Sequence, residues 1–579
     1  MKNCKTSQRQ SIFFSFMVIL VVSVGLLVRL VFLMIVHPNH YAAKGKEVQQ
    51  RERAIKAERG VIYDRNGIVI AGNKPVSTIS VIHNQIENKE QVILLLSELL
   101  QMEEEEIRKK VEKKTSREII KTNVEKKISD KIRKSHLSGV MIDEDYKRYY
   151  PYHKLASKVI GFAGGDNQGI IGLEVKYDSI LQGQDGTILT TTDGRGIEVE
   201  GEAEERLEPI AGNSLYTSID IRLQQFAQQA AQKIMIAKNS KNVRIIMMNP
   251  MNGEIYAMVN YPEFDLNHPF KLNRKRKKGE KEQEALNQMW RNHCVSDTYE
   301  PGSTFKVITA TSALEAGVVK LTDTFHCPGF KIVEDRRIRC HKTTGHGAET
   351  FVQGVQNSCN PVFMEVGARL GVDGMFRYMK QFGVLSKTGI DVPGEAGTIM
   401  HQKKNVGAVE LATMSFGQSF QLSPIRLLSS VSSIINGGKQ IIPHFGVRIE
   451  SADKRNVREL DYTMDKQVVS SETSKTMRDI LETVVSQGSG KKAAVAGYEV
   501  GAKTGTSEKL PRSSNKYIAS TLGFAPAKNP KILSIVLIDE PEGIYYGGSI
   551  AAPVISELLE DALPYLGVKA EKKKSVKNE

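Results

Sequence analysis

The sequence is poor in cysteine and proline, and it contains no internal repeat. Its 579 residues include 5 cysteines and 19 prolines. Five cysteines are too few for a disulfide scaffold, and the low proline content argues against a collagenous or low-complexity disordered chain. Hydrophobic residues make up 40% of the chain and charged residues 25%. This composition is typical of a globular protein, and the length predicts about three or four domains.

Acidic residues are outnumbered by basic ones. The 80 Lys and Arg residues against 66 Asp and Glu residues give a formal net charge of +14. Such an excess is compatible with a nucleic-acid partner, an anionic membrane or wall surface, or solvated lysines. The most basic stretch, residues 270–284, is predicted to be an exposed loop. The choice among these partners depends on the side of a membrane on which the chain lies.

One long hydrophobic run lies near the N-terminus. Residues 11–28 carry no charge, and the apolar sequence resumes after Arg29 and ends at Val36. A helix of this length crosses a hydrocarbon core of about 30 Å. A cleaved signal peptide is the alternative, but the apolar region of such a peptide is usually about 7 to 15 residues long. We therefore predict a single transmembrane helix at residues 11–36.

The charges before this helix predict its orientation. Lys2, Lys5 and Arg9 precede the apolar run, and the positive-inside rule places such residues in the cytoplasm. Residues 1–10 are then a cytoplasmic tail, and everything after residue 36 is extracytoplasmic. Because nucleic acid is not expected there, the basic stretches are interpreted as solvated loops and tails.

The rest of the chain alternates between strand and helix patterns. Residues 86–136 have apolar positions at helical spacing, whereas glycines divide residues 137–205 into what we predict to be short strands. Asp220 is expected to cap a helix that follows a short strand. Further segments are predicted from their patterns: a hairpin at 61–70, strands within 243–260, 517–526 and 531–541, and a final helix at 553–568.

Ser303 and Lys306 form the first pair that points to chemistry. A Pro-Gly turn precedes Ser303, which then opens a helix with an apolar body. Residues three apart lie on one face of a helix, and a lysine shielded from water can take the proton of a serine hydroxyl. The S-x-x-K spelling alone is weak, because it recurs in polar or glycine-rich stretches at Ser451, Ser489 and Ser513.

Two further triplets follow. Ser358, Cys359 and Asn360 are predicted to lie on a loop between helices, and residues 503–506 (Lys-Thr-Gly-Thr) on a strand. A second Lys-Thr-Gly, at residues 387–389, runs into a loop-like segment and is interpreted as a chance match. A glycine within the strand, Gly505, would let a substrate backbone lie where a side chain would collide.

These three motifs, in this order, resemble the S-x-x-K, S-D-N and K-T-G signature of penicillin-binding proteins and class A β-lactamases. The whole sequence is similar to class B penicillin-binding proteins. The segments that carry the resemblance include RGVIYDRNG, GLEVKYDSIL, MNPMNGEIYAM, KTGIDVPGE and FGQSFQLSPIRLLSSVSSIINGG. Cys359 stands where the signature has Asp, and this variant, with its additional upstream cysteines, resembles the stage V sporulation protein D type more than the general division type. The whole pattern is similar to that of the stage V sporulation protein D and septal transpeptidase type.

The resemblance implies an α+β multidomain fold. A single N-terminal transmembrane helix is followed by an elongated β-rich pedestal, the dimerisation domain, and by a transpeptidase domain with a central antiparallel sheet flanked by helices. The expected order is cytoplasmic tail, transmembrane helix, pedestal, linker, transpeptidase domain and charged tail, at residues 1–10, 11–36, 37–205, 206–239, 240–563 and 564–579.

The resemblance also implies an activity: a peptidoglycan D,D-transpeptidase of septal or spore cell-wall synthesis, acylated by β-lactams. A serine β-lactamase and a non-catalytic β-lactam sensor or scaffold are the alternatives. Ser303 would be the nucleophile, Lys306 its general base and Ser358 a proton relay toward the leaving group. Asn360 would hydrogen-bond to Lys306 or to the substrate amide.

The remaining implied roles concern substrate binding. Lys503 would supply positive charge, and Thr504 and Thr506, on either side of Gly505, would bind the terminal carboxylate of a D-Ala-D-Ala stem pentapeptide. The backbone N–H groups of Ser303 and Thr506 would form the oxyanion hole. The other partners implied are β-lactams, the membrane and a membrane glycosyltransferase, and no cofactor is implied.

Three cysteines surround the middle motif. Cys327, Cys340 and Cys359 lie in a predicted extracytoplasmic domain, where disulfides persist. We hypothesise a redox-sensitive Cys340–Cys359 disulfide that holds or distorts the Ser358 loop, with Cys327 as the competing partner of Cys340. The rival interpretation is a zinc site of His326, Cys327, Cys340, His341 and His346. Adjacent His-Cys pairs differ from the usual C-x-x-C spacing, so no metal is expected.

Overall fold

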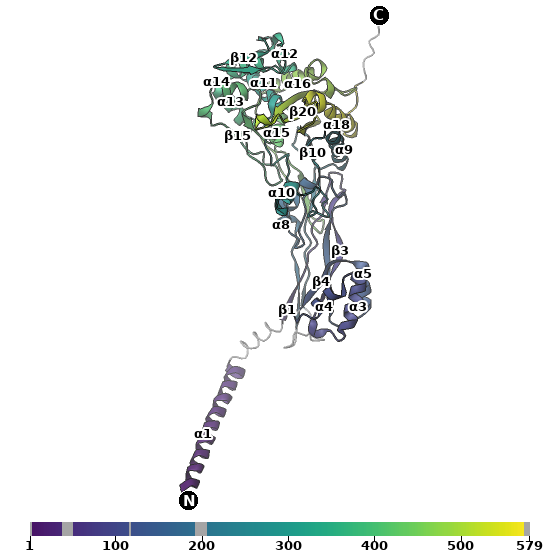
Figure 1. Ribbon diagram of the computed structural model, residues 1–579, viewed down its shortest axis with the longest axis vertical. Helices are drawn as coiled ribbons and strands as arrows, with labels where there is room; N and C mark the ends of the chain where they lie inside the picture. The colour runs from purple at the N-terminus through teal and green to yellow at the C-terminus, as the bar shows by residue number, and fades with distance from the viewer. Residues whose placement is uncertain (1–2, 37–49, 115–116, 192–204, 572–579) are drawn as a thin grey trace. The chain divides into compact units, whose positions relative to one another are not determined.

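The structure is a computed structural model that describes residues 3–36, 50–114, 117–191 and 205–571 (Figure 1). The chain forms two compact units, which are described separately. Unit 1 comprises Met1–Glu58, Lys74–Lys147 and Gln184–Ile210, and unit 2 comprises Arg59–Asn73, Arg148–Gly183 and Ala211–Glu579. The predicted pedestal therefore contains segments of both units. Its first residues, 37–49, and the end of the predicted tail, 572–579, lie outside the described residues.

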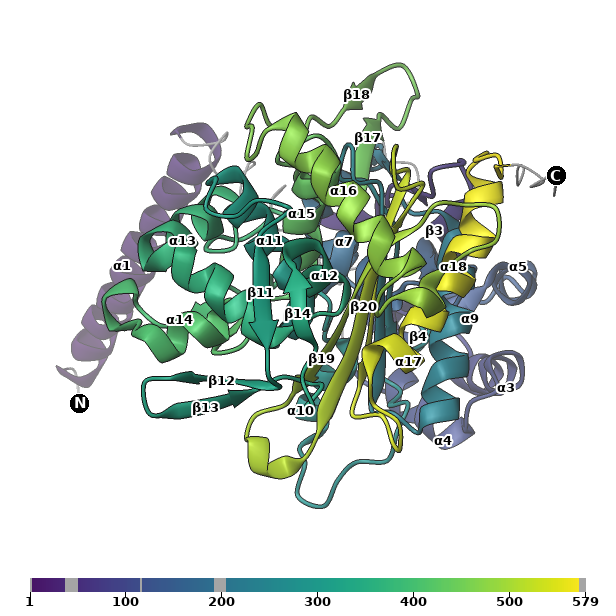
Figure 2. The ribbon, with the colours of Figure 1, turned by 90° about the horizontal axis from the view of Figure 1, so that it is seen from above.

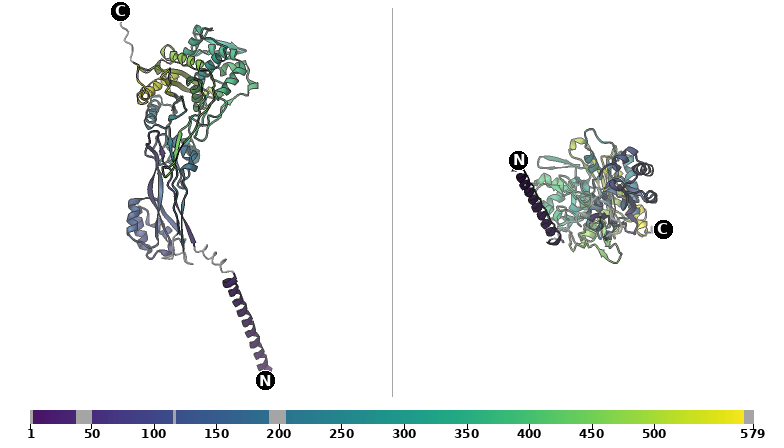
Figure 3. Two further views of the ribbon diagram at one scale, coloured as in Figure 1. Left: turned by 180° about the vertical axis from the view of Figure 1, so that it is seen from behind. Right: turned by 90° about the horizontal axis from the view of Figure 1, so that it is seen from below.

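The N-terminal hydrophobic run forms α1 (Asn3–Val31), which continues into a π-helical turn, η1 (Phe32–Val36). Residues Gln8–Ile35 are long and apolar enough to cross a membrane. Figure 3 shows α1, in purple, as one unbroken helix. The helix expected from the sequence is confirmed, and it fits a single-pass membrane anchor.

Unit 1 otherwise contains a small sheet and a group of helices with their own core. The sheet has the antiparallel order β1-β6-β7, from β1 (Gln50–Ile55), β6 (Gly186–Thr191) and β7 (Glu205–Leu207). Helical spacing at 86–136 correctly predicts α3 (Lys89–Leu100), α4 (Glu104–Val111) and α5 (Lys126–Lys134). The prediction misses β4 (Glu118–Glu125), which pairs with β3 (Val69–Val81), and β5 (Val140–Tyr149) also pairs with β3.

In unit 2, the predicted hairpin at 61–70 is confirmed. β2 (Ile62–Tyr63) pairs antiparallel with the start of β3, with Ile62 opposite Ala71. Asp64 closes the turn, because its Oδ1 accepts the backbone N–H groups of Asn66 and Ile68, each at 2.8 Å. Asp side chains favour turns for this reason.

The short strands predicted for residues 157–181 are wrong. This segment instead forms three short helices, α6 (Ser157–Ile160), α7 (Gly172–Lys176) and α8 (Asp178–Leu181). Leu173, Tyr177 and Leu181 follow one another at intervals of four residues and are all buried. That interval is a helical one, and the glycines around it concealed the signal.

A buried ion cluster lies in the same part of unit 2. Glu174 Oε2 accepts from Arg59 Nε at 2.6 Å, and Glu174 Oε1 accepts from Arg148 Nε at 2.7 Å. Arg59 also pairs with Asp178 at 2.8 Å. The side chains of Arg59, Glu174 and Arg148 are 1%, 0% and 6% exposed. We call these three residues the arginine–glutamate cluster.

The main sheet of unit 2 has five strands in the antiparallel order β10-β9-β21-β20-β19. Its strands are β9 (Asn242–Met248), β10 (Ile255–Tyr261), β19 (Gly501–Glu508), β20 (Tyr517–Ala525) and β21 (Ile532–Asp539). The strands predicted at 243–260, 517–526 and 531–541 are therefore confirmed. Strand β9 is buried along its whole length, and β19 is the edge strand beside which the candidate site lies.

Helices cover both faces of this sheet (Figure 2). Because side chains alternate along a strand, Val243, Ile245 and Met247 share one apolar core with α9 (Ile221–Lys238) and α18 (Ala552–Tyr565). The Asp220 side chain caps α9 as predicted, accepting from the backbone N–H groups of Arg222 and Leu223.

The opposite face carries most of the remaining helices and the short strands that position the site. These are α10 (Glu282–Trp290), η3 (Gly302–Thr304), α11 (Lys306–Glu315), β11 (Thr324–Cys327), β12 (Phe330–Val333), β13 (Arg336–Arg339), β14 (Gly347–Thr350), α12 (Phe351–Gln356), α13 (Asn360–Gln381), α14 (Ala408–Met414), α15 (Pro424–Ile435) and α16 (Ser471–Ser486). The sheet flanked by helices agrees with the predicted fold class.

Candidate active site

Ser303 lies in the single 3-10 turn η3, directly before α11. Gly302 has a φ of 55°, and a Cβ at this position would lie 2.6 Å from Ser507 Oγ, so the turn requires glycine. The Gly302 N–H donates to Gly417 O at 2.9 Å. The turn leaves Ser303 half-buried in the wall of a cleft of ≈ 430 Å³.

Lys306 is the first residue of α11, and its side chain is completely buried. Its Nζ donates to Ser358 O and to Asn360 Oδ1, each at 2.7 Å, and approaches Ser358 Oγ at 3.4 Å. Phe363 lies against it, with Nζ 5.2 Å from the ring centroid. The predicted contact between Lys306 and Asn360 is therefore present in the structure.

Ser358 lies between α12 and α13, on the interhelical loop that the sequence predicted. Its φ is 54°, a left-handed conformation that costs a non-glycine residue on the order of 1 kcal/mol. The next residue, Cys359, is the N-cap of α13. Asn360, the first residue of that helix, donates from Nδ2 to Arg339 O at 3.0 Å. The strained loop thus presents Ser358 and Asn360 together.

Lys503 is a second lysine that contacts Ser358. It lies on the edge strand β19 and is completely buried, and its Nζ donates to Ser358 Oγ at 2.8 Å and to Thr504 O at 3.1 Å. The Ser358 hydroxyl is thereby shared by two buried amines. We call Lys306, Ser358 and Lys503 the lysine–serine cluster.

The lysine–serine cluster is electrostatically unbalanced. Within the described part of the chain, no carboxylate forms an ion pair with either lysine, although thiols and Glu349 lie nearby. Burial lowers the pKa of Lys306 to about 8. Burial and the adjacent Lys306 lower the pKa of Lys503 well below its ordinary value. Both shifts favour the loss of a proton, as expected when two amines share one desolvated site.

Close packing between β19 and η3 explains the glycine of the third motif. A Cβ at Gly505 would lie 2.7 Å from Ser520 Oγ and 3.0 Å from Thr304 Cγ2. This glycine therefore lets the strand approach the turn that carries Ser303, and its predicted contact with a substrate backbone stays a prediction. Its neighbour Thr504 bonds weakly to Ser489 Oγ at 3.4 Å, and Thr506 Oγ1 accepts from the Gly547 N–H at 3.1 Å.

Most predicted site residues meet in one cleft, while the two lysines lie buried behind its wall. Ser303, Ser358, Asn360, Thr504, Gly505 and Thr506 all line it. Residues that the predicted site lacked also line it, among them His341, Phe416, Ser489, Tyr517, Tyr545 and Tyr546. Tyr545 and Tyr546 are adjacent in sequence and follow a predicted strand. This aromatic pair is the sequence feature that could have predicted their place in the cleft.

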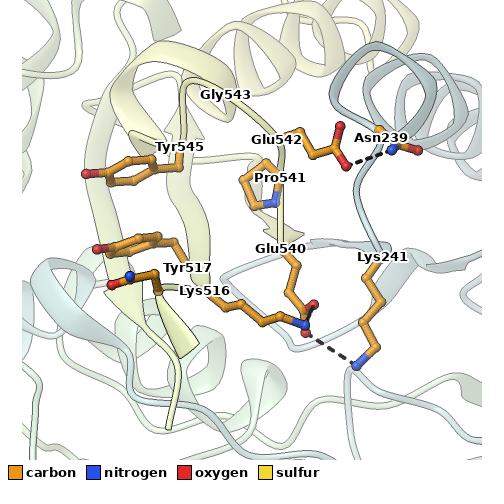
Figure 4. Close-up of a pocket in the computed structure, with 10 residues that line it drawn as sticks. Asn239, Lys241, Lys516, Tyr517, Glu540, Pro541, Glu542, Gly543 and Tyr545 are labelled. Carbon is orange, nitrogen blue, oxygen red and sulfur yellow. Dashed lines mark hydrogen bonds and ion pairs between the residues drawn. The ribbon is translucent and has the colours of Figure 1, made fainter. Parts of the chain in front are cut away.

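A second cavity, of ≈ 610 Å³, adjoins the cleft at the tyrosines (Figure 4). Tyr517 and Tyr545 line both spaces, and their rings stack at 4.1 Å with an angle of 12° between planes. Across the cavity, Lys241 pairs with Glu540 at 3.4 Å. The tyrosine stack is thus a wall common to the cleft and a charged cavity.

The other copies of the motifs lie elsewhere, with one exception. Ser451 and Ser513 are not among the cleft residues, and Lys516, the partner of Ser513 in the motif, is exposed and pairs with Glu540. The Lys-Thr-Gly at 387–389 lies in a segment without helix or strand, as predicted. Ser489 is the exception, because it lines the cleft beside Thr504.

The cysteines near the middle motif are free thiols in the structure. Cys327, Cys340 and Cys359 are buried. The sulfur atoms of Cys340 and Cys359 lie within 4.8 Å of each other, and the interaction of the two thiols lowers the pKa of Cys340 and raises that of Cys359. The hypothesis of a disulfide between them stays a prediction.

Comparison with known proteins agrees with this geometry. The family model of the penicillin binding protein transpeptidase domain matches residues 243–560, and that of the penicillin-binding protein dimerisation domain matches residues 54–217. Stage V sporulation protein D of Bacillus subtilis (strain 168) is 38% identical over 553 residues, which cover 94% of this chain and 84% of that protein.

Two other similarities extend over nearly the whole chain. The probable peptidoglycan D,D-transpeptidase PenA of Neisseria meningitidis is 29% identical over 569 residues, 96% of this chain and 92% of that protein. The crystal structure of penicillin binding protein 2X from Streptococcus thermophilus has a TM-score of 0.75 at 22% identity, covering 90% of this chain and 83% of that chain. The structural match shows the shared fold.

Proposed function

Because the chain belongs to the class B penicillin-binding proteins, whose transpeptidase and dimerisation domains it contains, we propose that it is a peptidoglycan D,D-transpeptidase. It cross-links stem peptides through an acyl-enzyme on Ser303. The observation that carries the proposal is the lysine–serine cluster, which holds Ser358 between two buried amines beside the cleft that contains Ser303. Lys306 follows Ser303 by three residues, and a buried lysine whose pKa is lowered can act as the base for such a serine.

Acylation begins when Ser303 Oγ attacks the carbonyl carbon of the penultimate D-Ala. Neutral Lys306 takes the hydroxyl proton, and the carbonyl electron pair moves onto oxygen. The backbone N–H groups of Ser303 and Thr506 stabilise this oxyanion, and each such donor lowers the barrier by about 3 kcal/mol. The C–N bond then breaks, Ser358 relays a proton to the leaving nitrogen, and terminal D-Ala departs from the ester.

The substrate carboxylate sets the protonation of the two lysines. In the proposal, Thr504 and Thr506 bind this carboxylate, and Lys503 supplies positive charge beside the site. An anion beside Lys503 favours the charged form of that amine. Because two adjacent buried ammonium groups repel each other, Lys306 then stays neutral. Substrate binding itself therefore produces the general base. In the second half-reaction an amine of a neighbouring stem attacks the ester carbon, and the Ser303 hydroxyl is restored.

The anchor and the domains complete the proposal. The positive residues before the apolar helix place the N-terminus in the cytoplasm and the catalytic domain outside. In the proposal, the pedestal spans residues 37–205, the linker spans residues 206–239 and the transpeptidase domain spans residues 240–563. The anchor and the pedestal are the parts that contact a membrane glycosyltransferase. Identity of 38% to a sporulation protein over most of the chain supports a role in septal or spore wall synthesis.

The proposal is tested with the full-length protein in detergent, a D-Ala-D-Ala pentapeptide and a fluorescent penicillin. Ser303→Ala should abolish both D-Ala release and penicillin labelling. Ser513→Ala is the matched control, because this serine also lies in an S-x-x-K spelling and a 3-10 turn but is exposed, and it should behave as wild type.

Other outcomes select the alternatives. Continued D-Ala release by Ser303→Ala would refute the assignment of the nucleophile. Rapid hydrolysis of penicillin by the wild type would identify a β-lactamase. Stable labelling without D-Ala release or cross-linking would identify a sensor or scaffold.

A further inference from the structure

Four potential metal ligands converge next to the middle motif. Cys327 ends β11, Cys340 follows β13, His346 precedes β14, and Cys359 caps α13. Their sulfur and imidazole nitrogen atoms all lie within 4.8 Å of one another. We call these four residues the thiol–imidazole cluster. It includes Cys359 and excludes His326 and His341, so it differs from the set considered from sequence.

Backbone pairing brings these residues together before any ion binds. Strands β11 and β14 pair antiparallel with Cys327 opposite Gly347, and the His346 N–H donates to Cys327 O at 3.1 Å. The β12–β13 hairpin returns the chain so that the Cys340 N–H donates to Gly329 O at 2.8 Å. The cluster is therefore preorganised by β structure, which the linear C-x-x-C criterion does not detect.

The spacing suits a tetrahedral ion bound by sulfur and nitrogen. Zinc binds thiolate at about 2.3 Å and imidazole at about 2.0–2.1 Å, so the ligand atoms of a tetrahedral site lie about 3.5–3.8 Å apart. Cys340 Sγ and His346 Nδ1 are 3.7 Å apart. Small side-chain movements suffice to bring the other atoms, within 4.8 Å, to such distances. Three cysteines and one histidine form a common structural zinc set.

A buried carboxylate beside the cluster also indicates a missing positive charge. Glu349 is 4% exposed, and its Oε1 accepts from Asn357 Nδ2 at 2.6 Å. Its Oε2 has no hydrogen-bond partner among the described residues and lies 3.8 Å from His346 Nδ1. An unpaired buried carboxylate oxygen is costly, and a cation bound at the thiol–imidazole cluster would place a positive charge beside it.

We propose that Cys327, Cys340, His346 and Cys359 bind a structural Zn²⁺ ion, whose charge the neighbouring Glu349 carboxylate helps to balance. Binding releases the protons of the three thiols, because the thiolate is the ligand. A Cys340–Cys359 disulfide would use only two of the four residues and leave the Glu349 oxygen unpartnered. The zinc site accounts for all five side chains.

The site has a consequence for the neighbouring motif, which rests on the proposed function. Cys359 stands between Ser358 and Asn360, so an ion that holds its sulfur also holds the strained loop on which both site residues lie. Loss of the ion should slow acylation of Ser303 without removing the nucleophile.

The direct test is the metal content of the full-length protein, purified in detergent without chelator and measured by mass spectrometry. Wild type should carry about one zinc ion per chain, the stoichiometry of a structural four-ligand site. Cys327→Ser and Cys340→Ser should lose it. Cys294→Ser is the matched control, because Cys294 is another buried free thiol of unit 2 outside the cluster, and it should retain zinc.

A second measurement does not depend on the folding of variants. Wild-type protein stripped of metal and titrated with Co²⁺ should show thiolate-to-cobalt charge-transfer and tetrahedral d–d absorption, and zinc should displace both. Absence of zinc together with a silent cobalt titration would overturn the proposal. So would a peptide carrying a Cys340–Cys359 disulfide in the native protein. Penicillin labelling is scored separately: zinc retained without labelling would refute the proposed function alone.

Discussion

Two buried clusters of charged side chains in unit 2 differ in how their charge is balanced. In the arginine–glutamate cluster, the carboxylate of Glu174 bonds to both Arg59 and Arg148. In the lysine–serine cluster, two amines share a neutral hydroxyl, and within the described residues neither forms an ion pair. The first arrangement stabilises fixed charges. The second favours proton loss from a lysine, and the neutral amine that results can act as a base.

The pKa shifts follow this difference. Burial alone would raise the pKa of Glu174, but Arg148 and Arg59 together outweigh it, and the pKa is lowered. Burial likewise opposes the charge on Arg59, but the Glu174 and Asp178 carboxylates outweigh it, and that pKa is raised. For Lys306 and Lys503 burial prevails, and both pKa values fall. Compensation, rather than burial, separates a structural cluster from a reactive one.

The largest expected effect is the loss of the general base. Lys306→Met fills the buried site with an apolar chain of similar length, so the fold should persist. Acylation by penicillin should slow by about 10²–10⁴-fold, the usual contribution of proton transfer by a positioned base. Stopped-flow labelling measures the rate constant.

Lys516→Met is the control for this change, because Lys516 belongs to the exposed copy of the motif and pairs with Glu540. Its acylation rate should match that of wild type. An unchanged rate in Lys306→Met would show that the buried amine has no chemical role, and the lysine–serine cluster would then not be a reactive one.

The second effect concerns the compensated cluster. Glu174→Gln leaves the buried Arg148 without its carboxylate and Arg59 with Asp178 as its remaining one, and it should lower the free energy of unfolding by about 3–5 kcal/mol. Chemical denaturation monitored by circular dichroism measures this change. Because the folded-state pKa of Glu174 is lowered, its stabilisation is full above the ordinary carboxyl pKa of about 4.3 and is lost as pH falls through the lowered value. If Glu174→Gln has the same free energy of unfolding as wild type, Glu174 does not compensate the charges of the two arginines.

A smaller effect tests the contact between β19 and the turn of Ser303. Gly505→Ala places a Cβ near Ser520 Oγ and Thr304 Cγ2 and should cost about 1–3 kcal/mol of unfolding free energy through overpacking. Acylation should slow as well, because the strand moves away from the turn. Gly397→Ala, where no atom lies within 4 Å of the new Cβ, should change neither quantity. Equal behaviour of the two variants would refute the packing role of Gly505.

The smallest effect is a pH dependence. Only the neutral amine of Lys306 accepts a proton, and its pKa is lowered to about 8, so the acylation rate should rise with pH and level off above about pH 8. Each pH unit below this value should cost about tenfold. Lys503, the nearby thiols and Glu349 are the charged or titratable groups that tune the midpoint. A flat wild-type profile from about pH 6 to about pH 9 would contradict the shift.

Sequence patterns predicted the central sheet and the site well where local chemistry decides the structure. The apolar strands around 245 and 535, the cap at Asp220 and the order of the three motifs all depend on neighbouring residues. The short helices α7 and α8 were missed, because glycines outweighed the four-residue spacing of the buried Leu173, Tyr177 and Leu181. The pairing of Ser358 with Lys503 and the grouping of Cys327 with Cys359 join distant parts of the chain. No local pattern encodes such contacts.

The most direct test of the central claim is the position of the penicillin adduct. The claim is that the unbalanced lysine–serine cluster activates Ser303 and no other serine of the cleft. Full-length protein is acylated with penicillin, digested and analysed by tandem mass spectrometry. We expect one adduct, on Ser303, which forms in wild type and is greatly slowed in Lys306→Met. An adduct on Ser358 or Ser489, or one on Ser303 that forms equally fast without Lys306, would contradict it.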